Sequence, residues 1–389
     1  MTAAVDLAAR IRAAADRAVA DVDVARLPGF LNAIDEVALL AMAWALRGGG
    51  LFRDGSAHTE AEIAAATGTA DRHRWILRRW LDVLSRHGLL HGDGTRFTRT
   101  RAVGRRELRE AARALTAAGD GLGYPAAMVD FLQRAFAQLP ALLRDEVSVQ
   151  ALLFADGEAD TADGAYRENT VNRYVNAAAA EAARWAAERR PAGAPVRVLE
   201  IGAGVGGTTT DLLGALVDVP VDYVFTDVSP YFLDLGRERF GERPGTRFAL
   251  LDANAAPLGE GVVEPGTRDL VVAANVLHNA HSVDACLRGV RELLAPGGLL
   301  LCVDTCRELP QILASMQFLM SPRKGGLGPG AHDFRAGTDR VFLSRPEWED
   351  ALRGAGLTPL ASAPGPEHPL DAVSVTLFAA RREGREGAG

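Results

Sequence analysis

The sequence has little lysine, little cysteine and no long apolar run, and each shortage argues against a class of protein. Lys324 is the only lysine among 43 lysines and arginines, and the 50 acidic residues give a net charge of -7. This balance argues against wholesale nucleic-acid binding. The three cysteines, Cys286, Cys302 and Cys306, have no metal-ligand spacing and favour a reducing compartment.

No secretory or membrane-spanning segment is expected. The chain begins MTAAVDLAAR, which is rich in alanine and has no apolar core of a signal peptide. The longest apolar run, Val37–Leu46, is too short to cross a bilayer and predicts a buried helix. We therefore expect a soluble, cytoplasmic protein that binds neither membrane nor nucleic acid. A length of 389 residues with 48% hydrophobic residues is enough for two domains.

What the sequence does have is a glycine-rich turn between a short strand and a helix. Residues 196–207 read VRVLEIGAGVGG. Glycines let the backbone approach a ligand closely and adopt positive φ without strain. The spacing of Gly202, Gly204 and Gly207 fits a dinucleotide fingerprint, whereas Gly202, Gly204 and Gly206 fit a loop that binds S-adenosylmethionine. The glycines alone leave both open.

Acidic residues at the ends of three successive strands favour S-adenosylmethionine. Glu200 precedes the glycines, where its carboxylate would repel a pyrophosphate but attract the cationic amino-acid end of S-adenosylmethionine. Asp227 ends the next strand and is placed to accept the ribose hydroxyls. Asp252 ends the third strand, near the expected adenine edge. One such acid is more often a helix cap, but three in successive units favour a nucleotide site.

Strands and helices alternate from Val196 onward, which predicts an α/β fold. The expected sheet is mostly parallel, doubly wound and Rossmann-like, and an antiparallel pair closes it. Its strands are expected at 196–201, 222–227, 246–252, 269–274, 298–304, 357–361 and 373–379. We place a catalytic domain at residues 186–380 and a disordered polar tail at 381–389.

Residues 1–185 are expected to form a mostly helical domain for dimerisation and for covering the substrate. Its first helices, around Leu7 and Ile11, are weakly amphipathic and are expected to pair with a second subunit. Helices within residues 101–150 are expected to wall one side of a substrate pocket.

Within this domain, residues 59–100 predict a winged-helix-like part. Thr59 and Glu62 can cap a helix that Gly68 ends, and a second helix and a small hairpin follow. A winged helix can bind DNA, but the acidic balance favours an architectural part whose arginines form a solvated face. These arginines are Arg72, Arg74, Arg78, Arg79 and Arg86.

Four motifs together resemble a known family. LEIGAGVGGTT, YVFTDVSP, DLVVAANVLH and LLAPGGLLL are similar to the S-adenosylmethionine methyltransferase domains of polyketide and non-ribosomal peptide megasynthases, over roughly residues 139–357. The winged-helix-like start resembles the dimerisation domain of small-molecule O-methyltransferases. Since the sequence has no carrier-protein or condensing domain, we expect a free-standing, homodimeric relative from antibiotic or other secondary metabolism. Its substrate would be a small-molecule or carrier-bound biosynthetic intermediate.

The resemblance implies S-adenosylmethionine as the cofactor. The glycines would line its methionine part above Glu200, and Asp227 would accept both ribose hydroxyls. Asp252 and Ala253 would lie at the adenine, and two tyrosines ahead of the sheet would cover the cofactor. The implied cofactor residues are Glu200, Gly202, Gly204, Gly206, Asp227, Asp252, Ala253, Asn275, Tyr166 and Tyr174.

His278 is the candidate catalytic base. It follows the fourth strand, at the carboxyl edge where α/β sheets bind ligands, and histidine can take a proton near neutral pH. In the resembling megasynthase domains a glutamate from the fifth strand orients this histidine. Asp304 occupies that position here and is one methylene shorter. This departure leaves the methylated atom, carbon or oxygen, open.

Three alternatives remain. Some methyltransferases of α-keto acids bind a metal with histidines in comparable places, so a metal-dependent C-methyltransferase could use His278 and His332. The spacing is not a recognised ligand pattern, and we predict no metal. A NAD-type oxidoreductase would place its pyrophosphate beside Glu200, and a winged-helix regulator would sense a ligand. The loop 321–340 is expected to be a mobile lid whose Arg323, Lys324 and Arg335 meet an anionic substrate or remain solvated.

Overall fold

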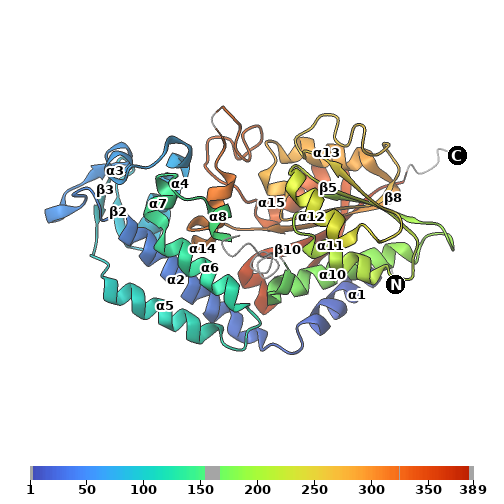
Figure 1. Cartoon of the computed structure of the whole chain (residues 1–389), viewed down its shortest axis with the longest axis horizontal. Helices are drawn as coiled ribbons and strands as arrows, with labels where there is room; N and C mark the ends of the chain where they lie inside the picture. The colour runs from blue at the N-terminus through green and yellow to red at the C-terminus, as the bar shows by residue number, and fades with distance from the viewer. Residues whose placement is uncertain (1–2, 154–166, 324, 385–389) are drawn as a thin grey trace.

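A seven-stranded sheet forms the C-terminal half of the computed structural model, which describes residues 3–153, 167–323 and 325–384 (Figure 1). Its order is β6-β5-β4-β7-β8-β10-β9, with the first five strands parallel and the last two antiparallel. The strands are β4 (Val196–Ile201), β5 (Val221–Asp227), β6 (Thr246–Leu250), β7 (Arg268–Ala274), β8 (Leu294–Thr305), β9 (Leu357–Ala363) and β10 (Val375–Arg382). The predicted doubly wound α/β fold is confirmed.

Helices cover both faces of this sheet because side chains alternate between the faces along each strand. In β4, Val198 packs towards one face while Leu199 and Ile201 pack towards the other. The first face is covered by α10 (Thr170–Ala187), α11 (Gly207–Ala215) and α12 (Pro230–Phe240), and the second by α13 (Val283–Leu293) and α15 (Arg345–Gly354).

The helices of the N-terminal half surround one apolar helix, α2 (Leu27–Ala45). By length and composition alone, residues 24–45 could cross a membrane, but 61% of that window is buried inside the chain. The prediction of a buried helix at 37–46 is therefore confirmed. The neighbours of α2 include α5 (Arg105–Gly119), α6 (Ala126–Ala137) and α7 (Leu139–Leu143), and α8 (Val149–Leu153) packs on α6.

The elements of the predicted winged helix are present. The helix α3 (Glu60–Thr67) begins with a capping box between Thr59 and Glu62 and ends at Gly68, whose φ is +67°. After α3 come α4 (Arg74–Arg86) and the hairpin of β2 (Leu90–Gly92) and β3 (Arg96–Arg99), with the short β1 (His58–Thr59) beside β3.

We had expected the arginines of α4 to form a solvated face, but two of them bind acidic residues elsewhere in the chain. Arg78 forms an ion pair of 2.6 Å with Asp339, and Arg79 lies 3.7 Å from Glu308. Both acidic partners belong to segments that follow β8, so α4 docks on the C-terminal half. These arginines are therefore already neutralised within the chain, which weakens the DNA-binding alternative.

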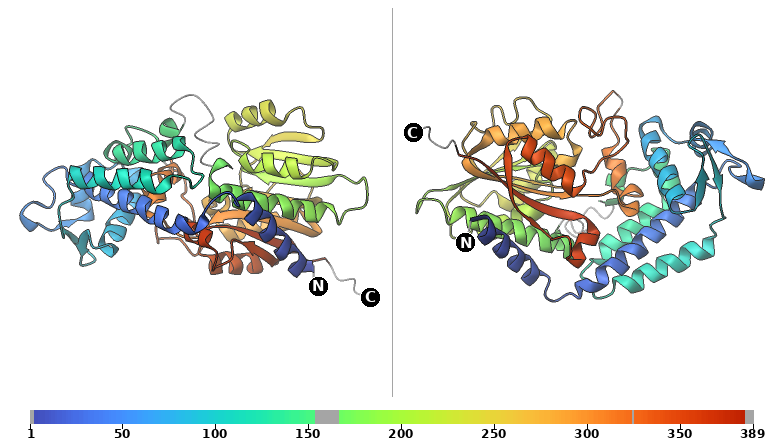
Figure 2. Two further views of the ribbon diagram at one scale, coloured as in Figure 1. Left: turned by 90° about the horizontal axis from the view of Figure 1, so that it is seen from below. Right: turned by 180° about the vertical axis from the view of Figure 1, so that it is seen from behind.

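The apolar face of α1 (Ala3–Ala18) is occupied within the chain. Leu7 and Ile11 are fully buried, and the helix packs along α10 and β9 (Figure 2). The expectation that this face pairs with a second subunit is therefore wrong, and the homodimer itself remains an untested prediction.

The last strand also extends beyond its expected end. Arg381 pairs with Leu299 of β8, and β10 runs to Arg382, so the predicted tail cannot begin at residue 381. The expected strand ended at Ala379, but the pairing with β8 continues through Ala380 and Arg381. Residues 385–389 lie outside the described part.

We expect Trp80→Ala to destabilise the whole protein, because Trp80 joins α4 to the segment after β8. Its ring is fully buried beside Phe318, and its Nε1 donates to the carbonyl of Leu313 at 3.3 Å. Removing a buried tryptophan costs about 3–5 kcal/mol, which urea unfolding would measure. The control is Trp44→Ala, at a half-buried tryptophan stacked under Arg47. Equal losses in the two variants would contradict this account of Trp80.

Candidate active site

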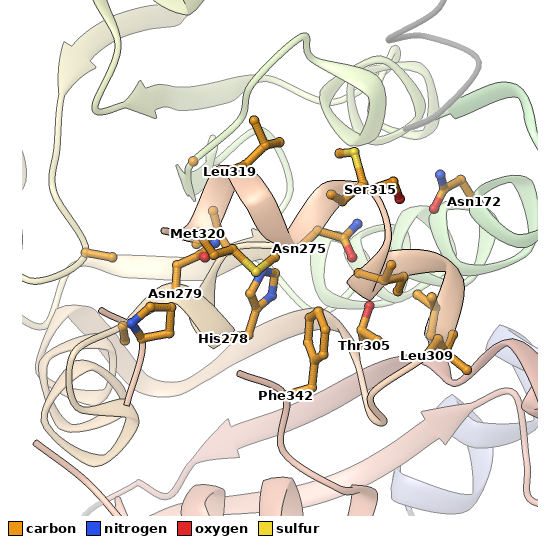
Figure 3. Close-up of a pocket in the computed structure, with 18 of the residues that line it drawn as sticks. Asn172, Asn275, His278, Asn279, Thr305, Leu309, Ser315, Leu319, Met320 and Phe342 are labelled. Carbon is orange, nitrogen blue, oxygen red and sulfur yellow. The ribbon is translucent and has the colours of Figure 1, made fainter. Parts of the chain in front are cut away.

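A cavity of about 680 Å³ lies at the carboxyl edge of the parallel strands (Figure 3). This is where open α/β sheets bind their ligands. One wall comes from the turns after β4, β5, β6, β7 and β8. The opposite wall comes from α6, the start of α10, α14 (Pro310–Leu313) and η6 (Met316–Met320). The expectation that residues 101–150 wall one side of the pocket is confirmed for α6.

The turn between β4 and α11 requires glycine. Gly202, Gly204 and Gly206 have φ angles of +64°, +55° and +78°. A Cβ on Gly202 would lie 2.1 Å from Cγ2 of Val276, and one on Gly206 would lie 2.4 Å from the ring of Phe240. Of the three glycines, Gly202 lines the cavity. The turn thus brings bare backbone to the cavity at Gly202, while Gly204 and Gly206 lie outside its lining, and the contact of the three glycines with a cofactor remains a prediction.

Asp227 is fixed at the end of β5 by two backbone donors. Its Oδ2 accepts from the N–H of Gly204 at 3.0 Å, and its Oδ1 accepts from the N–H of Ser229 at 2.9 Å. Burial raises the pKa of Asp227, and the backbone hydrogen bonds oppose this rise. The carboxylate lines the cavity beside the glycine turn. Its place and orientation suit an acceptor for paired hydroxyls.

Three further predicted residues line the same cavity: Asp252, Ala253 and Asn275. Asp252 lies two residues beyond the end of β6, and its Oδ1 accepts from the N–H of Asn254 at 2.8 Å. Asn275 follows β7 with φ of +57°, and its N–H donates to the carbonyl of Val303 at 2.7 Å. Such a conformation is unfavourable for a residue with a side chain and is concentrated at functional sites.

Glu200 joins β4 to α11 and β5 and is not part of the cavity lining. Its Oε2 accepts from the hydroxyls of Thr209 and Tyr223, both at 2.6 Å, and the side chain is 1% exposed. Burial raises the pKa of Glu200 to about 7. Because the Glu200 carboxyl is buried behind the cavity wall, its position does not suit the expected contact with the amino-acid end of a cofactor.

One of the two predicted tyrosines lies away from the cavity, and the other cannot be placed. Tyr174 is buried in the core, where its ring lies 4.9 Å from that of His368, outside the cavity lining. Tyr166 lies outside the described residues. Asn169 and Asn172, within the upstream segment that resembles the family, line the cavity instead.

His278 and Asp304 form a buried pair at the cavity. The His278 Nδ1 lies 2.7 Å from Oδ1 of Asp304, and Asp304 is completely buried. His278 sits on the short turn η5 (Leu277–Asn279) after β7, and Asp304 sits near the end of the adjacent strand β8. An aspartate acceptor places a proton on Nδ1 and leaves Nε2 as the basic nitrogen.

Although aspartate is shorter than glutamate, Asp304 contacts both the ring and the backbone N–H of His278. Its Oδ2 accepts from the backbone N–H of His278 at 3.2 Å while Oδ1 faces the ring. Oδ1 also accepts from the N–H of Thr305 at 2.8 Å. The histidine turn is therefore held close to β8, and the pair does not require the longer glutamate.

The loop after η6 is only partly as predicted. Arg335 is 2% exposed and pairs with Asp333, so it is neither solvated nor available to an anionic substrate. Arg323 is exposed, and Lys324 lies outside the described residues. Phe342, at the end of this loop, lines the cavity with its ring 5.0 Å from that of His278.

The two histidines of the metal alternative do not come together at the cavity. His332 is exposed and lies beside His281, with ring centroids 6.5 Å apart, away from the cavity lining. Over residues 3–153, 167–323 and 325–384, no group of three or more His, Cys, Asp or Glu could hold a metal ion.

Several lining residues escaped prediction because none of them belongs to a motif that the sequence shows. They include Tyr124 next to α6, Thr305 at the end of β8, and Gln311 and Ser315 after β8. Burial raises the pKa of Tyr124, so its hydroxyl keeps its proton. Of these residues, only Thr305 could have been predicted from the sequence, because it follows Asp304 at the end of a strand, where α/β sheets bind ligands.

Comparison with known proteins decides between the nucleotide cofactors. Residues 199–300 match the family model described as a methyltransferase domain. The chain carries a methyltransferase domain. The predictions of a methyltransferase enzyme and of S-adenosylmethionine as its cofactor are confirmed, and the oxidoreductase alternative does not agree with the match.

The relatives of this methyltransferase are much longer proteins. It is 29% identical to pyochelin synthetase PchF of Pseudomonas aeruginosa over 355 residues, which are 90% of this chain and 19% of PchF. It is 36% identical to polyketide synthase ThaG of Burkholderia thailandensis over 308 residues, which are 76% of this chain and 5% of ThaG. The chain therefore spans less than a fifth of the length of these relatives.

The fold of the methyltransferase has a near full-length match among solved structures. The CurJ carbon methyltransferase aligns with a TM-score of 0.86 and 23% identity, over 98% of this chain and 99% of that chain. This likeness extends over the helical N-terminal half as well as the sheet.

The described residues fit S-adenosylmethionine. The glycine turn leaves a Cβ-free backbone at the cavity, and Asp227 presents a fixed carboxylate next to it. Asp252 and Ala253 provide a further edge after β6. These groups suit the methionine part, the ribose and the adenine, in the order in which the strands lie in the sheet.

We expect Asp227→Ala to weaken the binding of S-adenosylmethionine about 10- to 100-fold, because hydrogen bonds to a charged acceptor contribute about 1.5–3 kcal/mol. Calorimetric titration would measure the dissociation constant. Asp222→Asn is the matched control, since Asp222 is paired with Arg268 at the opposite end of β5. Unchanged affinity in Asp227→Ala would contradict the assignment of the ribose site.

Glu200 makes the stability of this methyltransferase depend on pH. The folded state holds a proton with a pKa of about 7, whereas the ordinary value is 4.5, so stability falls as pH rises between these values. The loss is on the order of 3 kcal/mol. Glu200→Gln keeps the acceptor for Thr209 and removes the titration. Urea unfolding at pH 5 and pH 8 should show a flatter dependence in the variant, and identical slopes would disprove this role.

Proposed function

We propose that this methyltransferase transfers a methyl group to an acidic carbon of a biosynthetic intermediate, with His278 as the base and Asp304 as its partner. The observation that carries the proposal is the buried pair at the cavity, with His278 Nδ1 at 2.7 Å from Asp304. The whole-chain similarity of its fold to the CurJ carbon methyltransferase supports carbon over oxygen.

The pair suits proton removal from carbon. Asp304 accepts from Nδ1 and stabilises the imidazolium that forms when Nε2 takes a proton. A C–H next to one carbonyl is only weakly acidic, whereas a C–H between two carbonyls is within reach of a histidine base. The chemical class that fits is therefore a β-keto thioester or a similar 1,3-dicarbonyl.

S-adenosylmethionine supplies an electrophilic methyl group on a sulfonium. The chain's own contribution is position and exclusion of water. The glycine turn and Asp227 hold one side of the cavity, and His278 lies at the turn after the neighbouring strand, β7. Phe342 packs on the ring of His278 and limits its freedom to turn.

The opposite wall of the cavity favours an apolar substrate chain. It is formed by apolar side chains of α6, α14, the residue before α14, and η6: Met128, Phe131, Leu132, Leu309, Ile312, Met316, Leu319 and Met320. Burial of a hydrocarbon chain against such a wall contributes about 25 cal/mol per Å². The relatives are polyketide and pyochelin synthetases, which supports an intermediate carried as a thioester.

We expect His278→Ala to lose about 100- to 10,000-fold in kcat while binding S-adenosylmethionine with unchanged affinity. The reason is that removal of the imidazole abolishes proton transfer and leaves the glycine turn and Asp227 in place. Turnover would be measured with a β-ketoacyl N-acetylcysteamine thioester, and affinity by calorimetry.

The control for this variant is His281→Ala, because His281 lies three residues away and outside the cavity lining. Methyl-labelled S-adenosylmethionine and product NMR separate a new C–CH3 bond from an O–CH3 bond. Near wild-type turnover of His278→Ala would refute the base, and an O–CH3 product would refute carbon as the acceptor.

A further inference from the structure

Arg335 uses all of its guanidinium donors inside the protein. Its Nη1 donates to the carbonyl of His278 at 2.8 Å and to the carbonyl of Val341. Its Nη2 donates to the carbonyl of Ala280 at 3.0 Å and to Oδ2 of Asp333 at 2.8 Å, and its Nε donates to Oδ1 of Asp333 at 3.0 Å. These five contacts match the five N–H groups of an arginine.

The charge of Arg335 is balanced at the same place. Both side chains of the Arg335–Asp333 pair are fully buried, and Oδ2 of Asp333 also accepts from the N–H of Val283 at 2.9 Å. Burying such a pair is costly unless its remaining donors and acceptors are satisfied. An apolar pair would fill the same space without this desolvation cost. The buried ion pair therefore suggests that Arg335 and Asp333 hold neighbouring groups in position.

The backbone groups that bind this pair, three carbonyls and one N–H, lie on both sides of the proposed base. His278, Ala280 and Val283 form the turn from η5 to the start of α13, and Val341 precedes Phe342, which packs on the ring of His278. The arginine therefore joins the backbone of the histidine turn to the segment whose Phe342 packs on the histidine ring.

We propose that Arg335, held by Asp333, is a positioning residue that sets the orientation of His278 toward Asp304. Asp304 holds the ring and the N–H of His278, and Arg335 holds its carbonyl, so the side chain and both backbone polar groups of His278 are fixed. This inference rests on the proposed function, since it needs His278 to be the base.

The experiment compares Arg335→Lys with wild type in two measurements. Lysine keeps the charge but has three donors, so it cannot satisfy the five acceptors. We expect kcat to fall about 10- to 100-fold, as for a small displacement of a catalytic group, with KM and the affinity for S-adenosylmethionine unchanged. We also expect the downfield NMR resonance of the His278 Nδ1 proton, identified by its loss in His278→Ala, to shift or broaden.

The matched control is Arg340→Lys, at an arginine on the same segment that pairs with Glu347. It should keep both the wild-type kcat and the resonance. If Arg335→Lys does not fold, Asp333→Asn replaces it, and the same fall in kcat and change in the resonance are expected. Wild-type kcat and resonance in the folded variant would overturn the positioning role.

The two proposals fail in different ways. If His278→Ala retained wild-type turnover, the proposed base would be wrong whatever Arg335 does. If His278→Ala lost turnover while Arg335→Lys and Asp333→Asn did not, the base would stand and the positioning role would fall. The resonance reports the histidine's hydrogen bond to Asp304 without any substrate, so it tests the geometry directly.

Discussion

The two-point contact of Asp304 with His278 is the constraint on which the site depends. One carboxylate oxygen faces the ring and the other accepts from the backbone of the same residue, so the turn after β7 cannot move independently of β8. A parallel pair of strands places these residues side by side although 26 positions separate them in sequence. The sheet therefore provides the rigidity that the proposed base needs in order to stay aligned with its substrate.

Much of the catalytic half could be predicted because its patterns are local. The glycine turn, the strand-end acids and the histidine after β7 each occupy a short stretch, and parallel topology brings the carboxyl ends of strands to one edge. Asp227, Asp252 and His278 accordingly line the cavity. The buried state of Glu200 was not visible, because it depends on Tyr223 and Thr209, which no motif links to it.

The other wall could not be predicted because it depends on tertiary contacts between distant segments. Arg335 lies in a glycine-rich loop that reads as exposed, yet backbone carbonyls near His278 and the carboxylate of Asp333 enclose it. The face of α1 reads as available to a second subunit, yet α10 and β9 cover it. In both cases the sequence shows the charge or the apolar face but not the group that meets it.

The separation of the cavity walls along the chain has a consequence for how this enzyme can diversify. The residues proposed to meet the cofactor come from the sheet edge, whereas much of the apolar wall comes from α6 and η6, on segments outside that edge. Mutations in Phe131 or Leu132 can therefore change the shape of the proposed substrate site while leaving Asp227 and the glycine turn untouched. Substrate range and methyl-donor binding are free to evolve as separate traits.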